Sequence, residues 1–323
     1  MSLDAFLNDL KNLDLEGRLC MKKKSYAILA AIVLTTPPLL PPPEVEGAED
    51  YEVNYQDLDK QPLASNVDIP NVSGAVSNLP WENNENFIKA QEENGTNVLM
   101  AAYCAVLKDP LPGEELNVHL AASSIAGIVL EPNHVFSQNN AIGPYDESKG
   151  YQSGPTYMGS NLTTTIGGGV CKISSTLYNV SVLSNLEIVE RYNHSMPVPY
   201  VPYGQDATVS YGAKDFKFKN NTEFPILIWA EGIGNRLYVA LYGKEYPPKV
   251  EWNHKILNMV EAPKLYKINP NLNEGEENVL VEGMSGASVE SWVTITNSDG
   301  EIKTKNLGIS HYKPMPYVIE KNN

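Results

Sequence analysis

The sequence predicts a mixed α+β protein: helices at the front, a mainly antiparallel sheet around a helix that starts at a Gly-Gly-Gly-x-Cys turn, and a small C-terminal β extension. Three observations support this class. Apolar residues recur at helical spacing in the first part of the chain. Short runs with alternating apolar residues follow residue 185, the clearest at 225–230. Clusters of Pro, Gly and Asn separate these segments.

The front half is expected to hold two helices and one interrupted strand. Apolar positions at helical spacing indicate a helix within residues 85–107, which the Pro- and Gly-containing stretch 109–113 ends. A second helix is expected at 117–128 and strand-like residues at 129–136. Residues 137–168 are rich in Gly, Ser, Asn and Pro, and loops of this length in compact domains are usually functional or disordered.

The second half is expected to be β-rich after a helix at 171–183. The polar Asn297–Gly300 segment between two apolar runs predicts a hairpin turn. The strands that we expect are at 186–191, 198–203, 206–212, 215–219, 225–230, 236–242, 249–252, 278–282, 288–296 and 301–305.

The N-terminal region has the outline of a secretory signal. Residues 21–48 begin with lysines, continue with a short apolar run and end near small residues. We therefore expect residues 1–20 to lie upstream of the native start, 49–84 to form a flexible polar linker, and the protein to be secreted or associated with the cell envelope. A cytosolic protein with a disordered apolar tail is the alternative.

Composition excludes several classes of partner. Asp and Glu outnumber Lys and Arg by 39 to 24, giving a net charge of −15. Binding to nucleic acid regardless of sequence requires neutralisation of phosphates, so we expect no nucleic-acid partner. The apolar run of the signal is too short to span a bilayer, so we expect no integral membrane segment after its removal. The oligomeric state stays open.

The three cysteines do not form a metal-binding pattern. Cys20, Cys104 and Cys171 contain no Cys-x-x-Cys pair, and the histidines are scattered without ligand spacing. We therefore expect neither a metal ion nor another cofactor. Two interpretations of Cys104 and Cys171 are open. Either they form one disulfide after export, or Cys104 is a buried apolar residue and Cys171 is a free thiol. We favour the second interpretation.

The stretch from Gly167 to Cys171 is the strongest candidate for a site. A glycine-rich turn allows close backbone approach, and the amides of Gly168, Gly169 and Val170 are candidates for an oxyanion pocket. Cys171 in the first helical turn feels the positive end of the helix dipole, which favours the thiolate. A buried structural cysteine beside a tight turn is the alternative. A phosphate cradle is disfavoured because the P-loop spacing is missing.

Two further residues complete a possible nucleophilic set. His194 follows Cys171 after one predicted helix and one strand, which is enough chain to return the imidazole to the thiol. Asp206 starts another predicted strand and is placed to orient that ring. A cysteine, a base and an orienting acid support acyl transfer. Alternatively, His194 caps a strand and Asp206 holds a turn.

Several motifs in order resemble the VanW family over residues 113–245. They are the Gly-Gly-Gly-Val-Cys-x-Ile-Ser-Ser-Thr-Leu-Tyr-Asn run from Gly167, Leu186–Arg191 with His194-Ser195, Asp206–Val209, Phe136-Ser137-x-Asn139 with Gly143-Pro144 and Gly150-Tyr151, and Asp215 to Ile226. Two positions depart from the family pattern: Lys172 replaces the usual Gln, and Gln138 replaces a Phe. With the predicted elements on either side of this match, we expect the whole domain at 85–250 and the β-rich extension at 251–323.

The resemblance implies action on peptidoglycan stem peptides. Some members are associated with L,D-transpeptidase activity that makes 3-3 crosslinks through the family's cysteine, which here is Cys171. Substrate-contacting residues are then expected within the motifs and among the tyrosines: Lys172, Ser174, Ser175, Arg191, Tyr151, Tyr157 and Tyr200. A non-catalytic wall-binding protein and a cysteine peptidase that cuts the stem are the alternatives.

Overall fold

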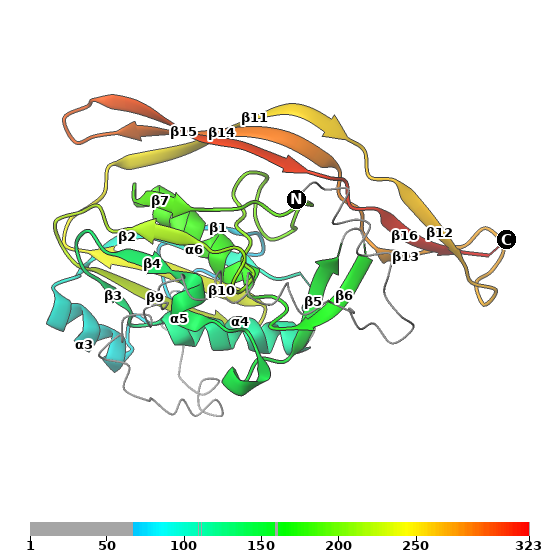
Figure 1. The fold of residues 1–323 in the computed structure, drawn as a ribbon, viewed down its shortest axis with the longest axis horizontal. Coiled ribbons are helices and arrows are strands. Elements are labelled where there is room, and N and C mark those ends of the chain that lie inside the picture. The colour runs from blue at the N-terminus through cyan, green and yellow to red at the C-terminus, as the bar shows by residue number, and fades with distance from the viewer. Residues whose placement is uncertain (1–66, 109, 111, 159–160, 323) are drawn as a thin grey trace, which may run out of the picture. The chain divides into compact units, whose positions relative to one another are not determined.

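The computed structural model describes residues 67–108, 110, 112–158 and 161–322 (Figure 1). The predicted upstream extension, the signal peptide and the first half of the predicted linker, residues 49–66, lie outside these residues. The prediction of a flexible linker is wrong for its second half, residues 67–84, because this segment contains a short strand at Gly74–Ala75 and its Leu79 and Trp81 side chains are buried in an apolar cluster. The described part is α+β, with few helices and several mainly antiparallel sheets. Its elements are β1 Gly74–Ala75, α3 Glu85–Asn94, β2 Val98–Val106, α4 Pro112–Ile125, β3 Val129–Leu130, β4 Val135–Ser137, α5 Gln138–Ile142, the 3₁₀ turn η3 Glu147–Lys149, β5 Ser153–Met158, β6 Asn161–Ile166, α6 Cys171–Leu183, β7 Glu187–Glu190, β8 Lys217–Lys219, β9 Ile226–Ile233, β10 Arg236–Gly243, β11 Lys249–Val260, β12 Lys264–Ile268, β13 Glu277–Val281, β14 Gly286–Thr296, β15 Ile302–Tyr312 and β16 Tyr317–Lys321.

A five-stranded antiparallel sheet in the order β1-β2-β10-β9-β3 supports the helices. The alternation predicted at 225–230 is confirmed in β9. Ile226, Ile228 and Ala230 face the main apolar core, to which α4 and α6 contribute, whereas Leu227 and Trp229 face a second cluster with Trp81 and Phe87. Both faces of this sheet are therefore buried, and α6 packs against β2 and β10.

The prediction of one helix within 85–107 is only half right. Helix α3 ends at Gly95, which adopts a left-handed φ of 64° and closes the helix with a backbone hydrogen bond to Gln91. The following apolar run, Val98–Val106, is a strand between β1 and β10. A strand buried on both faces has a nearly continuous apolar sequence, which periodicity alone does not distinguish from a helix.

Two other stretches also differ from the expectation. Residues 198–203 and 206–212 form loops and turns instead of strands. In the second stretch, the Ala207 backbone bonds to serine side chains of α6 and the Thr208 amide bonds to the Tyr192 carbonyl. Residues 137–168, expected as a loop, contain α5, the turn η3 and the β5–β6 hairpin. The helices expected at 117–128 and 171–183 correspond to α4 and α6.

The C-terminal part is confirmed as β-rich, with longer strands than predicted. Strands β11, β14 and β15 run side by side in an antiparallel sheet (Figure 1). The turn expected at Asn297–Gly300 joins β14 to β15, and Gly300 there has a φ of 86°. A second sheet has the order β12-β16-β13, of which β12 and β16 were not predicted. Within the described residues, no helix has the length and apolar character needed to cross a membrane.

The glycine turn before α6 is tightly enclosed by the β5–β6 hairpin. A Cβ on Gly168 would lie 2.2 Å from the backbone oxygen of Gly154, and a Cβ on Gly154 would lie 2.4 Å from that of Gly168. The buried Asn117 side chain donates to the carbonyls of both Gln152 and Gly168, at 2.8 and 2.9 Å. The close approach inferred for the glycines is therefore made to another backbone segment, and it fixes where α6 begins.

Gly168→Ala tests this enclosure. The new methyl group collides with the Gly154 backbone, which cannot yield, so we expect a loss of about 3 kcal/mol or more of unfolding free energy. Gly74→Ala in β1 is the matched control, because a Cβ there meets no atom within 4 Å. Urea denaturation should leave this control within about 0.5 kcal/mol of wild type. Equal stability of the two variants would contradict the proposed contact.

Candidate functional site

Cys171 is the first residue of α6 and is partly buried. Its Sγ lies 3.5 Å from Thr208 Oγ1, accepts from the Val209 amide at 3.4 Å, and is 3.6 Å from the Val209 carbonyl oxygen. Cys104 is fully buried in β2, and both thiols are free. The preferred interpretation of two unpaired cysteines is therefore confirmed over the disulfide.

His194 links the thiol to Asp206. Its Nδ1 lies 2.6 Å from Asp206 Oδ2, and its backbone amide donates to the same oxygen at 2.6 Å. The imidazole also interacts with the Cys171 side chain, and this interaction shifts the pKa values of both groups. Asp206 is only 1% exposed. The structure thus brings together the thiol, base and acid that the sequence predicted, in the order that a nucleophilic triad requires.

Burial and charge shift the pKa values of these groups in opposite directions. Burial raises the pKa of the Cys171 thiol, but the hydrogen bond and positive charge of His194, with donors from Thr208 and Val209, lower it more, to about 7. Burial lowers the pKa of His194, but its hydrogen bonds and charge interactions with Asp206 and Cys171 raise it to about 9. Between these values the pair is a thiolate and an imidazolium.

Ser174 and Ser175 are not placed to touch a substrate. Both are fully buried, and both hydroxyls donate to the Ala207 carbonyl, at 2.8 and 3.0 Å. Ser175 Oγ also accepts from the Ala207 amide at 2.9 Å. These bonds take the place of the backbone hydrogen bonds that a strand at 206–212 would have made to a neighbouring strand. The two serines therefore hold the segment that carries Asp206 and Thr208 against α6.

Arg191 and Tyr151 also differ from the expected substrate contacts. The guanidinium of Arg191 donates to the Asp206 carbonyl at 2.7 Å and to Asp206 Oδ1 at 3.0 Å, and it lies over the Tyr178 ring. It therefore fixes the acid. Tyr151 is 3% exposed and packs edge-on against Tyr145 in the core. The side chain of Tyr157 lies outside the described part of the chain.

Lys172 and Tyr200 flank the thiol. Lys172 forms an ion pair with Glu114, and its Nζ lies 4.8 Å from the centre of the Tyr200 ring. Tyr200 packs edge-on against His194, with ring centres 6.5 Å apart. Burial raises the pKa of Tyr200 well above its usual range, and the negative charge of Cys171 adds to the effect. The Lys172 charge is thus balanced by Glu114 beside the site.

The predicted oxyanion amides are only partly available. The Gly168 amide donates to the Thr165 carbonyl at 3.0 Å, and that of Val170 to the Gly167 carbonyl at 3.3 Å. Among the described residues, no backbone acceptor is assigned to the amides of Gly169 and Cys171. Gly169 has a φ of 107°, a conformation that favours glycine. We therefore favour the Gly169 and Cys171 amides as the donors for an oxyanion.

Sequence reasoning missed several neighbours of the site. Thr208 and Val209 contact the thiol directly, and Tyr312 from β15 donates to Asp206 Oδ1. Thr208 and Val209 belong to the Asp206–Val209 motif, which could have indicated that they lie near the site. No feature of the sequence around Tyr312 indicates its contact with Asp206. In the described residues, no group of three or more His, Cys, Asp or Glu side chains is arranged to bind a metal ion.

Comparison with known proteins finds similarity over the part of the chain that carries the site. Residues 113–242 match the family described as VanW like protein. Over 129 residues the chain is 43% identical to the uncharacterized protein YoaR of Bacillus subtilis, covering 40% of this chain and 43% of YoaR. It is 30% identical over 147 residues to the vancomycin B-type resistance protein VanW of Enterococcus faecalis, covering 44% of this chain and 52% of that protein. The chain thus spans about half the length of these curated relatives.

Among solved structures, the chain is similar to an IgA1 protease G5 domain. The similarity has a TM-score of 0.15 and 22% sequence identity, and it covers 24% of this chain and 95% of that domain.

Ser175→Ala should destabilise the protein by about 1–3 kcal/mol, because it leaves the buried amide and carbonyl of Ala207 with fewer partners. Ser181→Ala is the matched control on the same helix. Ser181 is also fully buried, but its hydroxyl has no hydrogen-bond partner. Chemical denaturation should show the control within about 0.5 kcal/mol of wild type or above it. Equal losses would show that burial alone accounts for the effect.

Alkylation of Cys171 by iodoacetamide should follow a pH midpoint near 7, because the imidazolium stabilises the thiolate. In His194→Ala that stabilisation is lost, so the midpoint should rise to the ordinary thiol value of about 8.5 or higher. Peptide mass spectrometry locates the label. Cys104 is the internal control, since burial raises its pKa to about 12 and it should stay unlabelled. An unchanged midpoint in the variant would exclude the thiol–imidazole pair.

Proposed function

We propose that this chain, whose residues 113–242 match the VanW-like family, is an exported protein that modifies peptidoglycan by cysteine-dependent acyl transfer. The reaction is an L,D-transpeptidation that joins stem peptides by 3-3 crosslinks. The observation that carries this proposal is the Cys171–His194–Asp206 arrangement, in which the pKa of the thiol is lowered and that of the imidazole is raised. A merely structural cysteine needs neither shift.

In the first half of the reaction, the Cys171 thiolate attacks the carbonyl carbon of the third residue of a tetrapeptide stem. The electrons of the carbonyl bond move to oxygen, which the amides of Gly169 and Cys171 stabilise. As the intermediate collapses, His194 gives its proton to the nitrogen of the terminal D-Ala. D-Ala leaves, and a thioester to Cys171 and a neutral His194 remain.

In the second half, an amine of a neighbouring stem attacks the thioester carbonyl. His194 takes the proton from that amine, and the thiolate leaves as the new amide forms. The thiolate and imidazolium are then restored. Asp206 remains a carboxylate throughout, consistent with its pKa, which burial raises but which His194 and Arg191 lower to below its usual value.

The surroundings of the thiol suit an anionic peptide. Lys172 lies at the start of the same helix, with Tyr200 beneath its ammonium group. Its partner Glu114 is 9% exposed. We propose that a stem carboxylate approaches Lys172 and shares its charge with Glu114, so that the substitution of Lys for the family's usual Gln tunes which stem binds. The tyrosines near the site help to exclude water, which favours the amine acceptor.

The cellular setting follows from the same proposal. The relative from Enterococcus faecalis is a vancomycin B-type resistance protein. A 3-3 crosslink uses a tetrapeptide that lacks the terminal D-Ala-D-Ala pair, so a protein with this activity fits a role in glycopeptide resistance. The signal-like sequence at 21–48 supports a location outside the membrane, where the proposed substrate is found.

The test is mass spectrometry of the purified protein incubated with disaccharide-tetrapeptide. Wild type should yield a 3-3 dimer with loss of D-Ala, and Cys171→Ala should reduce its formation by about 1,000-fold or more, because the nucleophile is lost. Cys104→Ala is the matched control. It removes the other described cysteine from the core and should retain turnover.

The other outcomes distinguish the alternatives. Cys171-dependent tripeptide without dimer would identify a peptidase in which water is the acceptor. Binding of the muropeptide without any turnover would identify a non-catalytic wall-binding protein. Dimer formation by the Cys171→Ala variant would exclude the cysteine mechanism.

A further inference from the structure

The carboxylate of Asp206 receives donors on both oxygens. Oδ2 accepts from the backbone amide and Nδ1 of His194, both at 2.6 Å. Oδ1 accepts from Arg191 at 3.0 Å and from the hydroxyl of Tyr312. The donors to Oδ2 come from the candidate base itself. The orientation of the carboxylate therefore depends on what holds Oδ1.

Both donors to Oδ1 depend on strand β15 in the C-terminal extension. Tyr312 lies on this strand, 106 residues from Asp206 along the chain. Arg191 Nη1 donates to Ser310 Oγ at 2.8 Å, so the same strand also anchors the guanidinium. Ser310 and Tyr312 are buried whereas His311 between them is exposed, as expected for alternate residues of one strand.

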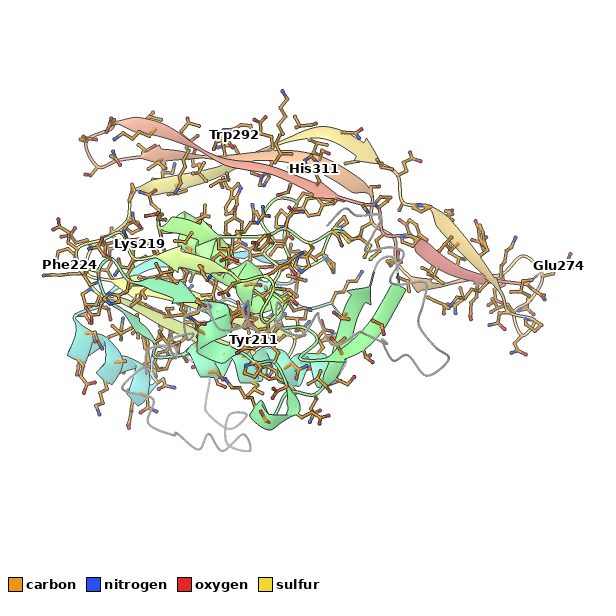
Figure 2. The ribbon with its side chains drawn as sticks, in the orientation of Figure 1. Tyr211, Lys219, Phe224, Glu274, Trp292 and His311 are labelled. Carbon is orange, nitrogen blue, oxygen red and sulfur yellow. The ribbon has the colours of Figure 1, made fainter. Side chains whose placement is uncertain are left out.

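The end of β15 is fixed against the loop that carries the site. The Lys313 amide donates to the Ser195 carbonyl at 2.8 Å, and Asn193 donates to the His311 carbonyl at 2.9 Å. His311, labelled in Figure 2, marks this end of the strand. The Tyr312 hydroxyl also accepts from the Gly204 amide at 2.8 Å. This hydroxyl is thus held in one place by the loop while it donates to the acid.

From these contacts we infer that Tyr312 is a positioning residue for Asp206, and that the C-terminal sheet is part of the machinery that sets the reactivity of Cys171. The inference rests on the proposed function, in which the thiol, imidazole and carboxylate act as one unit. The hydrogen bond from Tyr312 to Oδ1 fixes the orientation of the carboxylate. In that orientation Oδ2 faces His194 Nδ1, and the imidazolium stays beside the thiolate. Burial, with the adjacent Asp206 charge, raises the pKa of Tyr312 above its usual value, so the hydroxyl remains a donor in neutral and mildly alkaline solution.

The test is the pH midpoint of Cys171 alkylation in full-length Tyr312→Phe, which keeps the ring and removes the hydroxyl. If Tyr312 positions the acid, the freed carboxylate holds His194 less well. The midpoint should then rise by roughly one pH unit, a tenfold loss of thiolate below the midpoint. With disaccharide-tetrapeptide, kcat should fall while KM stays close to wild type, because no substrate contact is removed.

Tyr203→Phe is the matched control. The Tyr203 hydroxyl donates to the Ser285 carbonyl at 2.6 Å, so it bonds to the same extension, and its ring packs against Tyr312 with centres 5.4 Å apart. It makes no described contact with Asp206. This variant should lose thermal stability without moving the midpoint. Ser310→Ala, which releases Arg191, is the second test variant and should raise the midpoint by a smaller amount.

Two results would overturn the inference. An unchanged midpoint in both Tyr312→Phe and Ser310→Ala would show that β15 stabilises the fold only. A lower midpoint in Tyr312→Phe would show that the hydroxyl weakens the stabilisation of the His194 imidazolium by Asp206, and that it does not position the carboxylate. A wild-type midpoint at the ordinary thiol value is a separate outcome, which would remove the proposed function and this inference with it.

Discussion

The buried carboxylate of Asp206 is the group on which the arrangement of the site depends. A carboxylate that is 1% exposed is stable in its charged form only if its oxygens are fully hydrogen-bonded. Here the donors come from Arg191 and His194, which both lie in the loop after β7, and from Tyr312 at the end of β15. Satisfying one buried charge therefore brings together the loop after β7, the segment after Gly204 and the end of β15.

Asp206 influences the thiol through His194. The carboxylate favours the imidazolium, and the imidazolium favours the thiolate, even though burial opposes both charged forms. Arg191 reduces the net charge of the buried group without contacting Cys171. A low-dielectric setting strengthens each of these interactions, so small changes in the placement of the carboxylate have a direct effect on the nucleophile.

The position of the thiol is set from the other side by backbone packing. Gly168 and Gly154 approach so closely that neither tolerates a side chain, and Asn117 ties the turn to the hairpin. This fixes the first turn of α6. Ser174 and Ser175 then bind the segment from Ala207 onward to that helix, which brings Thr208 and Val209 to the sulfur. The residues that place the thiol are therefore mostly small and buried, and they do not act on the substrate themselves.

The sequence by itself determined the α+β class, the helix from Cys171 to Leu183, the alternating strand β9 and the hairpin turn before Glu301. These features depend on local periodicity and turn chemistry, which neighbouring residues encode. It also singled out Cys171, His194 and Asp206, because the chemistry of a thiol, a base and an acid in order is readable from residue types. Only the tertiary structure decided that Arg191, Ser174 and Ser175 face inward, and that β2 is a strand between two others. Only it revealed Tyr312, because a hydrogen bond across 106 residues leaves no trace in either local stretch of sequence.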